Sequence, residues 1–153
     1  MNSFYDRYRK MGLNGGGLDD ASIDDLEAHL GLPIPDAYRA YLSIAGSSPP
    51  PALIGSDCTV NYVRDLREWA ISCLEENNSP SLLPDNAIVF FMHQGYFFYY
   101  FLADGVTDDP AVYHYHAVTQ KEVIQVNDCF SDWVYIHATT PGRWPHPSEF
   151  GLM

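Results

Sequence analysis

The stretch FFMHQGYFFYYFL, residues 90–102, decides the fold, because it places eight aromatic residues and one histidine around a single glycine. Gln94 and Gly95 are typical of a tight hairpin turn, in which glycine adopts a positive φ without steric cost. A strand that is apolar on both faces normally lies centrally in a sheet that helices cover. The second arm is of this kind: Tyr96, Phe98, Tyr100 and Leu102 point one way, and Phe97, Tyr99 and Phe101 the other.

The same aromatic residues would also suit a platform on which nucleobases stack. Such a platform needs basic side chains that follow the phosphate chain. Residues 87–120 contain no arginine or lysine. The sequence therefore favours a hydrophobic core over a nucleic-acid surface.

Three helical patterns precede this hairpin. Ser22 is the expected N-cap of the first, and Gly31 follows its last apolar position. Pro35 suits the first position of a second helix that ends at Gly46, so a proline elbow joins the two. The expected apolar faces are Ile23, Leu26 and Leu30 in the first helix, Tyr38, Tyr41, Leu42 and Ala45 in the second, and Val63, Leu66, Trp69, Ala70, Cys73 and Leu74 in the third.

After the hairpin the chain continues as strands and ends in a short helix. A polar connection (103–110) leads to a third strand (111–118) and a fourth (119–126). A short helix in 127–138 should turn Phe130, Trp133, Val134 and His137 inward. Helices followed by strands predict an α+β fold, with the N-terminal helices packed on a mainly antiparallel sheet. We expect one domain over residues 1–153, with a core at about 18–138 and peripheral glycine-rich and proline-containing ends.

The charge balance is the most informative bulk property. Twenty acidic and eight basic side chains give a formal net charge of -12. A field of this sign repels phosphate backbones and anionic membrane surfaces, and it speeds the encounter with a basic protein. It therefore disfavours direct nucleic-acid binding. Acidity that serves only solubility is the alternative.

The sequence gives no sign of export or of a disulfide framework. No window approaches the ~20 apolar residues that cross a bilayer, and the N-terminus lacks an apolar signal region. We therefore expect a cytoplasmic protein. Cys58, Cys73 and Cys129 are odd in number and far apart, which predicts buried free thiols.

Catalytic patterns are weak. His114 and His116 share one face of the third strand and could hold a metal with a carboxylate, but no third ligand is identifiable. Because Tyr113 and Tyr115 alternate with them, we expect the tyrosines on the core face and the imidazoles on the more exposed one. His93 could act as a general base, but the sequence supplies neither a nucleophile nor an orienting acid. The pattern predicts no enzyme and no cofactor.

Three segments together resemble the SUKH superfamily, the Smi/Knr-type domains. LEAHLGLPIPDAYRAYLSIAG (26–46) is similar to its helix, proline elbow and second helix, residues 86–115 to its strands, and CFSDWV (129–134) to its closing helix. Ile34 and Ala45 depart from the pattern, standing where leucine and asparagine are usual. The signature positions are Glu27, Leu30, Gly31, Pro35, Tyr38, Leu42 and Gly46.

The resemblance implies a function in binding. Bacterial members are typically immunity proteins that neutralise a toxin domain, often a nuclease, and eukaryotic relatives are regulatory interaction modules. The implied partner is a cognate toxin of a polymorphic or contact-dependent system. A regulatory module and a metal-dependent enzyme that uses His114 and His116 stay open as alternatives, as does the oligomeric state.

Contact residues are predicted from charge and residue type. The connection before the third strand contributes acids, as does the end of the third helix, and aromatic residues are frequent hot spots in interfaces. Trp144 is an aromatic candidate that could equally fix the C-terminal tail. The predicted partner-binding set is Asp104, Asp108, Asp109, Glu75, Glu76 and Tyr99.

Overall fold

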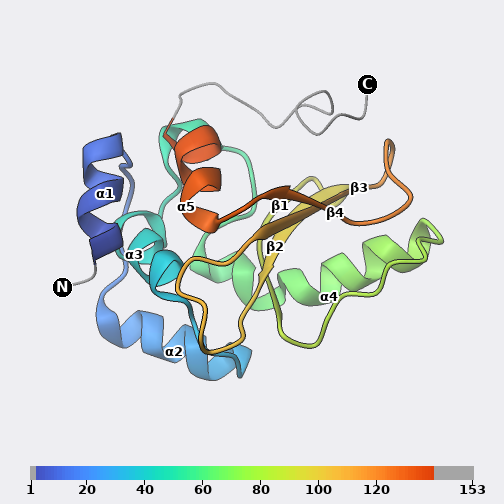
Figure 1. The fold of residues 1–153 in the computed structure, drawn as a ribbon, viewed down its shortest axis with the longest axis horizontal. Helices are drawn as coiled ribbons and strands as arrows, with labels where there is room; N and C mark the ends of the chain where they lie inside the picture. The colour runs from blue at the N-terminus through green and yellow to red at the C-terminus, as the bar shows by residue number, and fades with distance from the viewer. Residues whose placement is uncertain (1–2, 140–153) are drawn as a thin grey trace.

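A computed structural model of the chain describes residues 3–139. Its strands form one antiparallel sheet in the order β1-β2-β3-β4, and its longer helices precede the sheet in the chain (Figure 1). This arrangement confirms the α+β prediction. The elements are α1 Ser3–Met11, α2 Asp20–Leu30, α3 Asp36–Ala45, a 3-10 turn Pro51–Leu53, α4 Val60–Glu76, β1 Ala87–His93, β2 Phe97–Leu102, β3 Val112–His116, β4 Ile124–Asn127, α5 Phe130–Trp133 and a π-helical turn Val134–Ala138.

The hairpin of β1 and β2 turns as predicted. Gln94 and Gly95 have φ of 51° and 76°, and the Tyr96 amide donates to the His93 carbonyl over 3.2 Å. Two successive positive φ values match a turn whose twist suits antiparallel strands. The register of β1 shifts between Val89 and Phe91, which marks a bulge at Phe90.

The aromatic residues of β2 fill the core, as predicted. Residues 97–101 expose at most 5% of their surface, because β1 and β3 flank the strand and helices cover the sheet. The rings of Phe90 and Phe91 both contact Trp133 of α5, at centroid distances of 4.8 and 5.7 Å. Figure 1 shows α5 and α4 on opposite sides of the sheet. Tyr38 of α3 completes this cluster, with its ring 5.1 Å from that of Phe101.

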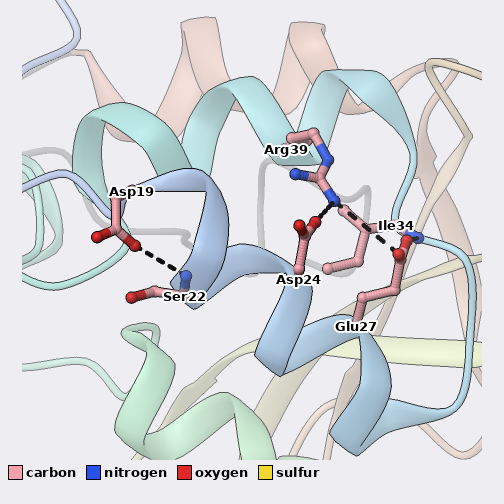
Figure 2. A network of polar contacts seen from close by, with 6 residues as sticks. All are labelled: Asp19, Ser22, Asp24, Glu27, Ile34 and Arg39. Atoms are coloured by element: carbon pink, nitrogen blue, oxygen red, sulfur yellow. Dashed lines mark hydrogen bonds and ion pairs between the residues drawn. The ribbon is translucent and has the colours of Figure 1, made fainter.

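The α2 helix begins earlier than predicted. Asp19 is its N-cap, because the Asp19 carboxylate accepts a hydrogen bond of 2.8 Å from the Ser22 amide (Figure 2). Ser22 lies inside the first turn, so its predicted capping role was wrong. Gly31 follows the last helical residue in the left-handed conformation, as the sequence indicated.

A polar network closes the elbow between α2 and α3. The Glu27 carboxylate accepts a 2.7 Å hydrogen bond from the Ile34 amide, and Arg39 reaches back to Asp24 over 2.8 Å (Figure 2). Pro35 was predicted as the first residue of α3. It is instead the N-cap, one position before the first helical residue. The network gives Glu27 a structural role, because its side chain satisfies a backbone donor that the turn leaves without a helical partner.

The first helix, α1, has no counterpart among the predicted elements. Tyr8 is 0% exposed, and its hydroxyl donates to the Ala37 carbonyl over 2.8 Å. Leu13 is also buried, so the core includes residues before position 18. The glycine segment packs closely, because a Cβ at Gly17 would collide with the Ser43 carbonyl oxygen.

Two details of the later elements differ from the sequence-based expectation. Trp69 was assigned to the buried stripe of α4 but is 44% exposed, whereas the other predicted members of that stripe are buried. The fourth strand was expected over 119–126 but begins at Ile124, because the preceding residues form the turn after β3. The inward orientation of Phe130, Trp133, Val134 and His137 is confirmed.

Candidate functional site

The predicted acidic contact residues lie near opposite ends of β3. Asp104, Asp108 and Asp109 precede its first residue, whereas Glu75 and Glu76 end α4 near the turn that follows its last residue. A hydrogen bond from the Ser79 hydroxyl to the Lys121 carbonyl joins the segment after α4 to the turn that follows β3. The two segments that carry the five acids, the connection between β2 and β3 and the end of α4, therefore lie apart (Figure 1).

Asp104 organises the connection in which it lies. Its carboxylate accepts from the Thr107 hydroxyl at 2.6 Å and from the amides of Thr107 and Val106 at 2.7 and 2.8 Å. These hydrogen bonds, that of the Thr107 hydroxyl above all, stabilise the charged form and lower the pKa of Asp104 to about 2. The side chain is exposed and negatively charged, but its orientation is set within the loop.

Asp108 and Asp109 are neighbours with different surroundings. The Asp109 carboxylate accepts from the Ser131 amide and hydroxyl at 2.8 and 2.6 Å, and so attaches the connection to the start of α5. The backbone carbonyl of Asp108 accepts from the Ala37 amide at the start of α3. The Asp108 side chain is exposed, whereas Asp109 is half-buried. Of these two, Asp108 is the better placed to meet a partner.

Tyr99 does not lie on the surface. It is 0% exposed, and its ring packs 5.4 Å from that of Trp133 and 4.6 Å from that of His114. Its predicted role as a contact residue was wrong, because α5 covers the face of β2 to which it points. Trp144, the other aromatic candidate, lies outside the described residues.

His114 and His116 share a face of β3, with ring centroids 6.3 Å apart. His114 is only 1% exposed, so the expectation of an exposed imidazole was wrong for this residue. Its Nδ1 lies 2.8 Å from Oε1 of Gln120, and burial lowers its pKa to about 3. Within residues 3–139 there is no group of three or more histidine, cysteine, aspartate or glutamate side chains positioned to hold a metal.

His93 has a neighbour that the sequence did not reveal. The Ser56 hydroxyl lies 3.2 Å from His93 Nδ1, and the backbone of Asp57 pairs with Met92 beside them. Burial raises the pKa of Asp57 and lowers that of His93, so both groups shift toward their neutral forms. A catalytic triad instead needs an ionised acid that stabilises the imidazolium. The contact is therefore better explained as packing at the edge of the sheet.

Cys58 and Cys73 are buried free thiols, as predicted, and Cys129 is half-buried. Burial raises the pKa of the Cys58 thiol to about 12. A reactive cysteine needs a lowered pKa and access to solvent. Cys58 therefore has the properties of a core residue.

A surface that the sequence analysis missed runs along α4. Tyr62 and Trp69 are each 44% exposed, and acids lie beside them. Their spacing of seven residues, two helical turns, is the signal that could have identified them as one face. We define the α4 outer face as the exposed residues Tyr62, Asp65, Glu68, Trp69, Ser72 and Glu76.

Arginines of the central helices are engaged with acids. Arg39 pairs with Asp24 at 2.8 Å, and Arg64 pairs with Asp25. Arg67 donates to the carbonyl of Pro84 at 2.9 Å and also approaches Asp85. These cations are therefore held away from the α4 outer face.

Comparison with known families agrees with this architecture. The sequence model of the SMI1 / KNR4 family (SUKH-1) matches residues 17–135, which extend from the glycine segment to the turn after α5. The chain belongs to this family. The resemblance inferred from the elbow, the strands and the closing helix is thereby confirmed. No curated protein matches the chain. None of the described helices is long and apolar enough to cross a membrane.

Proposed function

We propose that this member of the family is an immunity protein, which binds a toxin domain and neutralises it without turnover. Family membership supports a binding role, because bacterial SUKH proteins typically act in this way. The proposed partner is a nuclease or another enzyme that acts on nucleic acid. The proposed place of action is the cytoplasm, where such a toxin reaches its target.

The distribution of charge is the observation that carries this proposal. The chain has a formal net charge of -12, and Arg39, Arg64 and Arg67 are engaged in ion pairs. Three of the eight bases are thus engaged with acids, and the acids outnumber the bases by twenty to eight. A nuclease presents a basic cleft to its substrate, so an acidic protein can cover that cleft after rapid electrostatic association.

The proposed contacts are drawn from the exposed acids. Asp108, Glu75 and Glu76 have exposed side chains, and Asp104 contributes its charge from an ordered loop. Asp109 is better regarded as a structural residue that holds α5. Charge reversal at Asp108 therefore tests the acidic connection, the segment 103–110 between β2 and β3. Charge reversal at Asp109 would also disturb the fold.

Co-expression tests the function directly. The probe is the C-terminal domain of the protein that the neighbouring gene encodes, produced in cells with and without the present chain. We expect the chain to restore growth and to purify in a complex with that domain. Persistent growth arrest together with the absence of a complex would overturn the proposal.

Kinetics then test the role of charge. Asp108→Lys should lower the association rate several-fold at low ionic strength and weaken the dependence of that rate on salt, because the field toward a basic partner is reduced. The matched control is Ala28→Lys, which adds the same side chain at an exposed position of α2. Equal rates for the wild type and Asp108→Lys would exclude the acidic connection as a contact or steering element.

A further inference from the structure

We propose that the α4 outer face is the surface that docks on the toxin, with Tyr62 and Trp69 as its anchors. This inference rests on the proposed function and adds the location of the interface. The partner surface that it requires is rich in lysine and arginine and has apolar hollows for two aromatic rings. The sequence-based contact set included neither anchor.

Helix geometry places the face along one line. Tyr62, Asp65, Trp69, Ser72 and Glu76 follow one another at intervals of three and four residues, and so form a stripe ~21 Å long. The buried stripe of α4 packs against β1, which fixes the helix in place. Because both residues are 44% exposed, part of each is held by its own molecule and part is presented to solvent. Anchors held in this way lose little freedom on binding.

Charge on α4 is segregated. The α4 outer face carries Asp65, Glu68 and Glu76 and no base, whereas Arg64 and Arg67 reach acids on neighbouring segments. Complementarity therefore selects a basic partner over a neutral one. A second copy of this acidic chain would be repelled.

The stability of α4 does not account for this charge pattern. Glu75 and Glu76 lie at its C-terminal end, where the helix dipole disfavours anions, and its last turn contains no base. Asp65 and Glu68 are three residues apart and repel each other. Acids in unfavourable positions, beside exposed tyrosine and tryptophan, are better explained by a partner. Aromatic anchors surrounded by polar side chains are typical of binding hot spots.

The test measures affinity for the same C-terminal toxin domain by titration calorimetry. The double variant Tyr62→Ala/Trp69→Ala should bind at least about 30-fold more weakly, because truncation of hot-spot aromatic residues has large effects. Ser72→Arg keeps both rings and places a cation between Trp69 and Glu76, and should weaken binding at least about tenfold. If the double variant loses stability, Ser72→Arg still tests whether the α4 outer face binds the toxin.

Two control variants are matched to these changes. Tyr135→Ala removes the ring of a residue that is 61% exposed after α5, and Ala28→Arg adds the same cation on an exposed position of α2. Both should bind within about twofold of the wild type. Wild-type affinity in Ser72→Arg and in the folded double variant would overturn this inference alone. Failure of the wild type to bind would instead overturn the proposed function on which it rests.

Discussion

Trp133 and Trp69 are the same residue type in opposite surroundings. Trp133 is 0% exposed where α5 meets β1 and β2, and its ring lies 4.8 Å from that of Phe90. Trp69 is 44% exposed at the margin of the apolar stripe of α4. The region beneath α5 therefore stabilises the fold, whereas the α4 outer face leaves part of its aromatic surface in contact with solvent.

The contrast extends to other pairs of like residues. His114 is buried beneath the same cluster and His116 is half-buried, and Asp109 holds α5 while Asp108 is exposed. In each pair the neighbouring elements decide the role of the side chain. Each pair therefore offers a substitution and its matched control.

The tryptophan pair should show the largest difference. Trp133→Ala should lower the free energy of unfolding by about 3–5 kcal/mol, because it removes a buried ring and leaves a cavity among aromatic side chains. Trp69→Ala should change it by less than about 1 kcal/mol, since the ring is already partly solvated. Denaturation in urea, followed by circular dichroism, measures both. Similar losses of unfolding free energy in the two variants would contradict the distinction between a stabilising cluster beneath α5 and a solvent-exposed α4 outer face.

Much of the fold could be predicted because its signals are local. Alternation along β2 and the Gln94-Gly95 turn require only neighbouring residues, and both were correct. The α1 helix could not be found in this way. Its sequence contains few aliphatic residues, and Tyr8 is buried through a contact with α3, far away in the chain.

The candidate site was harder to predict, because exposure depends on tertiary packing. Tyr99 was included among the contact residues and Trp69 in a buried stripe, but Tyr99 is 0% exposed and Trp69 is 44% exposed. Helical periodicity places Trp69 at the edge of the apolar stripe but does not reveal how far neighbouring elements extend over it. Strand alternation likewise assigns Tyr99 to a face, but only the position of α5 determines that this face is closed.

The histidine pair should differ in its effect on acid stability. Burial lowers the pKa of His114 from the ordinary value of 6.5 to about 3, so the unfolded chain binds the proton first as the pH falls. Its contribution is complete above pH 6.5 and is lost progressively down to about pH 3, with a slope approaching about 1.4 kcal/mol per pH unit. His114→Gln should remove this slope from unfolding curves measured between these limits.

His116→Gln is the matched control for that measurement. His116 is half-buried, and burial also lowers its pKa, but its ring keeps contact with solvent. Its replacement should leave most of the acid dependence in place. Equal slopes in the wild type and His114→Gln would show that His114 is not held neutral by the cluster beneath α5.

The aspartate pair tests how the acidic connection is attached. Asp109→Ala should cost about 2 kcal/mol of unfolding free energy, because the Ser131 amide and hydroxyl lose a charged acceptor. Asp108→Ala should stay within about 0.5 kcal/mol, since its side chain is exposed. Urea denaturation of both variants provides the comparison. A larger loss at Asp108 would reverse the assigned roles.

Asp104 is an intermediate case, because it is exposed and yet its carboxylate accepts hydrogen bonds from Thr107 and Val106. Its pKa of about 2 should appear as the midpoint of its carboxyl resonance in an NMR titration. Thr107→Val removes the hydroxyl donor and should move this midpoint upward, toward 3.8. The lowered pKa means that the stabilising contribution is present above pH 3.8 and is lost as the pH falls through about 2.

The control for this titration is Asp19, whose pKa is lowered by separate hydrogen bonds from Ser22. Its midpoint should be the same in the wild type and in Thr107→Val, because α2 is not altered. An Asp104 midpoint that Thr107→Val leaves unchanged would mean that the loop does not hold this carboxylate in solution. Asp104 would then resemble Asp108, and the acidic connection would present two mobile charges to a partner instead of one fixed and one mobile.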